Sequence, residues 1–174
     1  IEFFDKFSNV YLLNNSFISV EDIIIYGFTG WTMPIFKNTM EAIKFLNDYK
    51  RIKTKNGKFR VEDHKNIAIN QIEKFKEFID TIEHEKIIII THFPPIKEGT
   101  SNPIYINDPL NNYFSWPNML QNLDIQTNKI KVWCSGHTHW SYDFIKDNVR
   151  YISNQVGYFD ENIDFSKDGV YELL

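Results

Sequence analysis

Apolar and polar residues follow two different rhythms along this chain, and each rhythm predicts one kind of element. Three short runs are apolar almost without interruption, which predicts strands; they cover residues 23–26, 87–90 and 130–134. The run at 23–26 is typical of a strand buried on both faces of a sheet, and the four isoleucines at 87–90 predict a buried strand. Between 63 and 83, apolar residues instead recur every three or four positions with Lys and Glu opposite, which predicts a long amphipathic helix. This mixture of strands and helices indicates an α/β or α+β layered fold.

Shorter patterns predict further elements of both kinds. Asn38 and Glu41 resemble the start of a helix, and apolar residues follow them at helical spacing as far as Tyr49. A second short helix is predicted at 115–123, with Pro117 in its first turn. The other predicted elements are strands at 10–13 and 17–20 around a turn at 14–16, a hairpin of 142–145 with 149–152, and a last strand at 169–173.

Two polar segments are interpreted as loops. Residues 51–60 are basic and contain Asn56-Gly57, so a solvated surface loop is the favoured interpretation and contact with nucleic acid the less favoured one. Residues 97–112 are rich in Asn, Pro, Gly and Ser, which predicts a long loop of the kind that often covers a site. No repeat or break in composition divides the 174 residues, so we expect one domain or a large part of one.

Composition narrows the function classes only slightly. The formal net charge of −4 argues mildly against a dedicated nucleic-acid binder, although a local basic patch stays open. Cys134 lies alone in an apolar run, which predicts a buried thiol in a reducing, cytoplasmic compartment. No apolar run approaches about 18 residues, so no membrane span is predicted. The chain begins with Ile1 rather than Met, and we interpret it as a segment of a longer polypeptide.

Three of the five histidines are candidates for chemistry. His64 and His84 lie in charged, helical surroundings and are expected on the surface. His92 follows the run of isoleucines and precedes two prolines, and His137 and His139 follow the apolar run that ends at 134. Any one of them alone is more simply a core histidine. Because ligands bind beyond the carboxyl ends of strands in open α/β sheets, three histidines at two such ends together favour a metal site.

The spacing of the last two histidines adds a geometric expectation. Residues i and i+2 of a straight strand point to the same face, so the two rings would be parallel if the strand continued. Gly136 precedes them and is expected to allow a tight bend that directs the rings to neighbouring points in space.

At these residues the chain resembles the calcineurin-like metallophosphoesterases. Two motifs match the last two metal-binding motifs of that family in order and spacing: Thr91-His92-Phe93-Pro94-Pro95 and Gly136-His137-Thr138-His139. Flanking segments are similar too, and the resemblance covers nearly the whole chain: 9–15 before the turn at 27–31, 47–52, 107–114, and 154–158 with 161–162.

The resemblance implies a fold and a reaction. The fold would be part of a layered α/β/β/α sandwich, with two mixed sheets flanked by helices. The reaction would be hydrolysis of a phosphomonoester or phosphodiester by a hydroxide activated between two metal ions, of Mn, Fe, Zn or Ni. His92 and His137 would bind one metal and His139 the other, with Trp31 and Tyr105 as candidate substrate contacts. The acidic balance favours a small phosphorylated substrate, with nucleic acid left open and no membrane partner expected.

The chain also departs from the family pattern. An Asp-x-His, a Gly-Asp-x-x-Asp and a Gly-Asn-His-Glu/Asp motif normally precede the matched part, and none occurs here. We therefore interpret residues 1–174 as the C-terminal portion of a single metallophosphoesterase domain that requires its N-terminal part for activity. Two alternatives stay open: a non-catalytic binding or scaffold protein that keeps the fold with an incomplete site, and a hydrolase that holds one metal on the three histidines.

Overall fold

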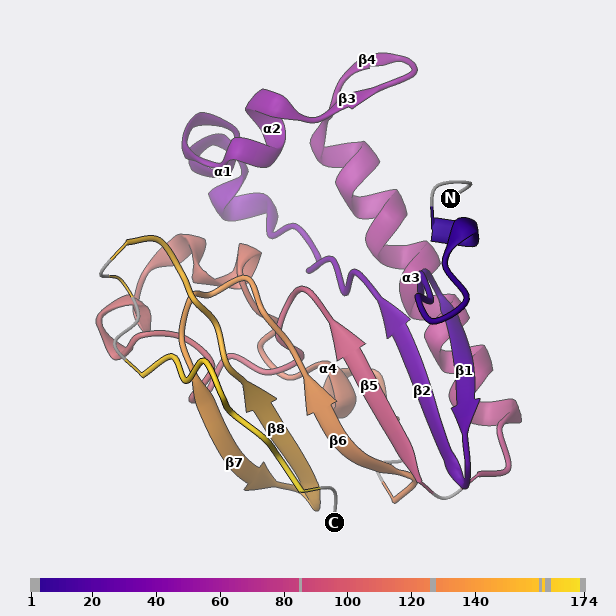
Figure 1. Ribbon diagram of the computed structural model, residues 1–174. Coiled ribbons are helices and arrows are strands. Elements are labelled where there is room, and N and C mark those ends of the chain that lie inside the picture. Colours follow the sequence, from indigo (N-terminus) through magenta and orange to yellow (C-terminus); the bar gives the residue numbers. More distant parts are fainter. Residues whose placement is uncertain (1–3, 85, 126–127, 160, 162–163, 173–174) are drawn as a thin grey trace.

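A mixed six-stranded sheet forms the centre of the computed structural model, which describes residues 4–84, 86–125, 128–159, 161 and 164–172 (Figure 1). The strand order is β1-β2-β5-β6-β8-β7, with both edge strands antiparallel to their neighbours and the four central strands parallel. The strands are β1 Ser16–Val20, β2 Ile23–Phe28, β5 Ile87–Thr91, β6 Ile130–Cys134, β7 Tyr142–Lys146 and β8 Val149–Ser153. This arrangement confirms the predicted mixed α/β class.

Helix α3, Val61–Thr81, covers one face of this sheet. Its apolar stripe packs Phe75, Phe78 and Ile79 against the inward-facing residues of β2, β5 and β6 in one core cluster. The rings of Tyr26 on β2 and Phe78 stack with centroids 4.2 Å apart. The predicted helix at 63–83 is thus confirmed, with ends that differ by two residues.

The opposite face of the sheet is more open than the apolar runs predicted. On β5, Ile87 and Ile89 are fully buried, whereas Ile88 is half-buried and Ile90 is 43% exposed. Because side chains alternate across a strand, α3 covers only the first pair. The strand predicted at 87–90 is therefore confirmed, but among the described residues only one of its faces is fully buried.

A second, smaller unit lies beyond one end of α3, and we call residues 36–60 the cap. It consists of η2 Phe36–Asn38, α1 Thr39–Phe45, α2 Asn47–Arg51 and the small hairpin of β3 Lys53–Thr54 with β4 Gly57–Lys58. The helix predicted from Asn38 is broken at Leu46, which is extended with φ −76° and ψ 135°. A separate apolar cluster holds the cap: Ala42, Leu46, Tyr49, Phe59 and Tyr113.

The long segment between β5 and β6 is mostly irregular, as predicted. It contains the 3-10 helices η3 Pro103–Tyr105 and η4 Pro109–Tyr113, and the short helix α4 Met119–Asn122. The helix expected at 115–123 is therefore reduced to one turn. A further 3-10 turn, η1, covers Phe4–Lys6. No helix within the described ranges is long and apolar enough to cross a membrane.

Two predicted strands are absent from the described residues. Residues 10–13 are irregular, and Val10, Tyr11 and Leu12 stay exposed because no strand pairs with them. The N-terminal hairpin instead joins β1 to β2 around Glu21, whose φ of 54° makes the tight turn. Residues 169–172 are also irregular, and 173 lies outside the described residues.

Candidate metal centre

The parallel strands place the candidate histidines at one edge of the sheet. Strands β2, β5, β6 and β8 run in the same direction, so their carboxyl ends meet there. His92 directly follows β5, and His137 follows the adjacent β6 by three residues. The loop after β2 fixes His92, because the backbone N–H of His92 donates to the carbonyl of Thr29 at 3.0 Å.

His92 and His137 form a close pair. Nδ1 of His137 and Nε2 of His92 lie 2.9 Å apart, and the backbone N–H of Gly136 donates to the carbonyl of His92 at 3.0 Å. The His137 ring also packs against two aromatic rings, with ring centroids 4.1 Å from that of Phe93 and 5.0 Å from that of Phe114. These contacts hold both imidazoles in one orientation before any ligand arrives.

The bend that separates His137 from His139 is made by the histidines themselves. His137 has a φ of 70° and His139 a φ of 53°, whereas Gly136 does not take a positive φ. The N–H of Thr138 donates to the carbonyl of Gly136 at 2.9 Å, which closes a three-residue turn around His137. The expectation that Gly136 makes the bend is wrong. Non-glycine residues at positive φ are strained by about 1–3 kcal/mol each and cluster at functional sites.

Gln155 holds this strained turn in place. Its Oε1 accepts the backbone N–H of His139 at 2.7 Å, and its Nε2 donates to the carbonyl of Trp140 at 2.9 Å and to Oγ of Ser153 at 2.8 Å. Gln155 follows β8, so the last of the parallel strands supports the loop that carries the ligand candidates.

Glu161 was not among the predicted site residues, yet it contacts one of them. Its Oε2 lies 2.7 Å from Nδ1 of His139 and also accepts the backbone N–H of Tyr158 at 2.8 Å. The N–H of Tyr158 is the main cause, and His139 a lesser one, of a pKa for the Glu161 carboxyl below its usual value. A carboxylate that orients an imidazole is a frequent neighbour of metal-binding histidines.

Burial keeps the paired imidazoles neutral. It lowers the pKa of His137 to about 3, helped by the nearby His92 and His139, and it lowers the pKa of His92 as well. His139 contributes to both shifts, so its ring is electrostatically close to the pair. Neutral imidazole is the form that binds metal ions.

The distance within the pair fits a shared metal ion. Consider two nitrogens that are each about 2.0–2.1 Å from one ion. They lie about 2.9 Å apart when the nitrogen–metal–nitrogen angle is a right angle, and about 3.4 Å apart when it is tetrahedral. The observed 2.9 Å between His92 Nε2 and His137 Nδ1 equals the value for a right angle, and without an ion it is the length of a hydrogen bond between the two rings. The described residues do not, however, gather three or more His, Cys, Asp or Glu side chains into one group able to hold a metal.

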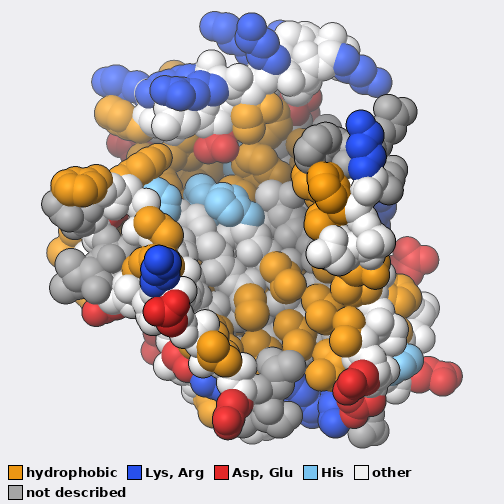
Figure 2. All heavy atoms as spheres, viewed as in Figure 1, with side chains coloured by type: hydrophobic (Ala, Val, Ile, Leu, Met, Phe, Trp, Pro, Cys, Tyr) orange, Lys and Arg blue, Asp and Glu red, His pale blue; other side chains and the backbone are white. Residues whose placement is uncertain are grey.

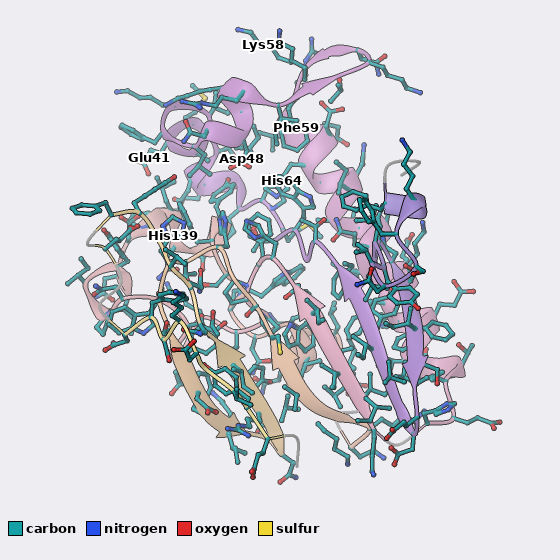
Figure 3. All side chains as sticks on the ribbon, in the orientation of Figure 1. Glu41, Asp48, Lys58, Phe59, His64 and His139 are labelled. Carbon is teal, nitrogen blue, oxygen red and sulfur yellow. The ribbon has the colours of Figure 1, made fainter. Side chains whose placement is uncertain are left out.

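The cap adds a carboxylate on the same side as the histidines. Asp48 on α2 is half-buried, and its charge acts to raise the pKa of His92 against the larger effect of burial. Figure 3 shows Asp48 and Glu41 on the side of the cap nearer to His139. Asp48 is not among the predicted site residues, because the segment 47–52 shows only a resemblance and indicates no role.

The two candidate substrate contacts lie in different surroundings. Trp31 follows β2 and packs against Phe93, with ring centroids 5.0 Å apart, so it forms part of the wall behind the histidine pair. Tyr105 lies on η3 and is 50% exposed. No ring contact or hydrogen bond of its hydroxyl group joins Tyr105 to the other described residues.

The prediction that His64 lies on the surface is wrong. This residue is only 2% exposed, and Nδ1 of His64 lies 2.7 Å from the hydroxyl of Tyr49, so it joins α3 to the cap (Figure 3). Burial lowers its pKa to about 4. The spacing could have revealed this, because His64, Ala68, Gln71 and Phe75 follow one another on the buried stripe at successive intervals of four, three and four residues. The prediction of an exposed His84 is confirmed.

Comparison with known proteins agrees with this arrangement. A protein of Acanthamoeba polyphaga mimivirus, described as "Uncharacterized protein L509", is 30% identical to this chain in an alignment 176 residues long that covers 92% of the chain. The chain spans 59% of the length of that relative. The model of the calcineurin-like phosphoesterase family matches residues 2–141, which include all three candidate ligands. With this match over most of its length, the chain belongs to the calcineurin-like phosphoesterase family.

Proposed function

We propose that the intact protein is a metal-dependent hydrolase of phosphate monoesters or diesters, and that this chain supplies its histidine ligands. The close approach of His92 Nε2 to His137 Nδ1, 2.9 Å at the carboxyl edge of the sheet, is the observation that carries the proposal. Membership of a phosphoesterase family supports the same reaction class. The metal would be Mn, Fe, Zn or Ni, since imidazole nitrogen suits these ions.

The residues divide into ligands and supports. His92 and His137 would bind one ion and His139 a second, with Glu161 orienting the His139 ring through its contact with Nδ1. Two bound metal ions would stabilise charge on the phosphoryl oxygens and lower the pKa of the attacking water. Gln155 fixes the turn that carries two of the ligands, and Trp31 and Tyr105 are proposed to flank the substrate.

Three neutral imidazoles alone are a weak site for two ions, so carboxylate ligands are needed. We propose that they come mainly from a segment that precedes this chain in the intact protein. Asp48 lies near enough to His92 to act on its pKa and would add negative charge beside the site. The substrate is a phosphorylated molecule in which at least one phosphate reaches the histidine edge.

The test is hydrolysis by the intact protein loaded with Mn²⁺. The substrates are p-nitrophenyl phosphate as a monoester and bis(p-nitrophenyl) phosphate as a diester, and we expect turnover of at least one. His137→Ala should lower kcat/KM by about a hundredfold or more and reduce the metal content, because it removes a ligand. His84→Ala, which changes an exposed histidine, is the matched control and should change neither.

The competing scaffold function makes the opposite prediction. If the intact, folded protein holds no metal and turns over neither ester, the enzyme hypothesis is wrong and the binding alternative stands. Two equivalents of metal that are lost together when His137 and His139 are both replaced by Ala would exclude the scaffold alternative.

A further inference from the structure

The net charge of −4 conceals a strong separation of charge within the chain. The cap, residues 36–60, contains eight of the 19 Lys and Arg residues but only two of the 23 Asp and Glu residues. Its formal charge is therefore +6, and that of the remaining residues is −10. The cationic residues are Lys37, Lys44, Lys50, Arg51, Lys53, Lys55, Lys58 and Arg60.

No carboxylate of the described chain neutralises these cations. The four ion pairs among the described residues all lie outside the cap, and they involve Asp22, Glu98, Asp143 and Glu161. Within the cap, Lys50 donates to the carbonyl of Phe45 at 3.2 Å, and Nζ of Lys44 lies 5.1 Å from the centre of the Phe45 ring. The cap thus presents a positive surface that the fold itself does not compensate.

The hairpin of the cap shows that this charge is unfavourable to the folded state. Lys53 and Lys58 are direct partners across the two short strands, and Lys55 stands beside the turn. Like charges directly opposite each other destabilise a strand pair. All three lysines are exposed, so they gain nothing from burial. A ligand of opposite charge would explain the arrangement, because it would relieve the repulsion when it binds.

The position of the positive surface relates it to the candidate metal centre. Lys and Arg side chains gather at the top of Figure 2, over the cap, and histidine side chains lie recessed below them. Trp31 connects the two regions. Its ring centroid lies 5.6 Å from that of Phe59 in the cap and 5.0 Å from that of Phe93 beside the histidine pair. A ligand on the cap would therefore extend towards the histidine edge.

Exposed aromatic rings accompany the charge. Phe45 on the cap is 58% exposed, and beyond the histidines Tyr158 is 72% and Phe159 95% exposed. The Tyr158 ring stands edge-on to His139, with centroids 4.6 Å apart. Surfaces that bind single-stranded nucleic acid combine cations for the backbone with aromatic rings on which bases stack.

We propose that the cap binds the phosphate backbone of a single-stranded nucleic acid and directs one phosphodiester towards the three histidines. A lone phosphate group carries a charge of only about −2, whereas eight cations spread from Lys37 to Arg60 suit a polymer with many phosphates. The delivery of a phosphodiester for hydrolysis rests on the proposed function. Binding by the cap does not, so the two can fail separately.

The test measures the binding of a labelled oligothymidylate of about 20 nucleotides, longer than the roughly 4–16 nucleotides that one small binding domain covers. Fluorescence anisotropy would follow the intact protein in EDTA, which prevents turnover. The test variant is Lys53→Glu/Lys55→Glu/Lys58→Glu, which keeps like charges opposite each other in the hairpin. The matched control is Lys74→Glu/Lys76→Glu/Lys167→Glu, which makes the same charge change at exposed lysines outside the cap.

The expected result is a loss of at least about tenfold in affinity for the cap variant and less than about threefold for the control. The slope of log K against log salt should also become shallower by about 2, because each lost contact to a single strand contributes about 0.7. Equal weakening by both variants, or no binding by the unmodified protein at micromolar concentration and low salt, would overturn the proposal. Tighter binding to phosphatidylserine vesicles, or to a duplex, would also overturn it.

A hydrolysis assay separates this proposal from the proposed function. The cap variant should still hydrolyse p-nitrophenyl esters at the rate of the unmodified protein, since the three histidines are untouched. If the unmodified protein binds the oligonucleotide through the cap but hydrolyses no ester, the proposed function fails and the binding surface stands.

Discussion

The sheet and the cap are held together in different ways. The sheet buries one continuous apolar cluster that includes residues of α3, β2, β5, β6, β7 and β8, and in it Trp133 and Phe75 are fully buried. The cap relies on a cluster of five buried residues and on one histidine from α3. Its polar link, His64 to Tyr49 at 2.7 Å, is buried among aromatic rings.

Because the two clusters are separate, we expect the cap to open while the sheet stays intact. Stability follows the area of apolar surface buried, so the sheet and α3 should unfold as one cooperative unit. The cap carries a net charge of +6 and buries few residues, so it should open at a lower free energy. Three predictions test this comparison.

The largest effect is expected from a cavity in the centre of the sheet core. Phe75→Ala removes a ring that packs against Phe28 and Trp133, with ring centroids 5.1 Å and 5.6 Å apart. It should lower the free energy of unfolding by about 3–5 kcal/mol. Urea denaturation of the intact protein, followed by circular dichroism, measures this change.

The same substitution in the cap is the matched comparison. Phe59→Ala removes a buried ring from the cap cluster. Hydrogen exchange should accelerate in residues 36–60, while the amides of β5 and β6 keep their protection. If Phe59→Ala instead lowers protection throughout the sheet, the cap and the sheet form one cooperative unit and the comparison is wrong.

The second effect depends on pH and acts through His64. Burial lowers its pKa from 6.5 to about 4, so the folded state keeps it neutral where the unfolded chain would bind a proton. The stabilisation is complete above pH 6.5 and is lost as the pH falls towards 4, because the unfolded state binds more protons in that window. A pKa difference of this size corresponds to about 3 kcal/mol.

Replacing His64 by Gln isolates its contribution to the pH dependence of stability. Between pH 6.5 and 4, the stability of His64→Gln should fall less steeply than that of the unmodified protein, because Gln does not titrate. His84→Gln, at an exposed position, should keep the original slope. Identical slopes for all three proteins would show that His64 binds its proton equally in both states.

The elements that the sequence predicted correctly are those fixed by local periodicity. The stripe of α3 and the isoleucine run of β5 need only one buried face each, and the hairpin of β7 and β8 needs only a short turn around Asp147 and Asn148. Residues 10–13 also have an apolar pattern, but a strand requires a partner, and β1 pairs with β2 instead. Pairing is a property of the tertiary structure that the pattern does not contain.

The candidate site was predictable in part for the same reason. The two apolar runs predicted that His92 and His137 follow adjacent strands. The contact between the two rings follows from the parallel register of β5 and β6. The contributions of Glu161, Gln155 and Asp48 were not predictable from periodicity, because each reaches the site from a loop or a separate helix. The charge of the cap was visible in the sequence, but its position beside the histidines was not.

The smallest effect is expected from the hydroxyl group of Tyr49. Tyr49→Phe keeps the ring in the cap cluster but removes the partner of His64 Nδ1. A buried polar atom left without its partner lowers stability by about 1–3 kcal/mol, so the cap should open more often while the sheet is unaffected. Hydrogen exchange in residues 36–60 measures this opening, and Tyr11→Phe, at an exposed tyrosine, is the control. Because the same contact joins the cap to α3, a Tyr49→Phe protein with unchanged exchange would show that apolar packing alone holds the cap over the histidines.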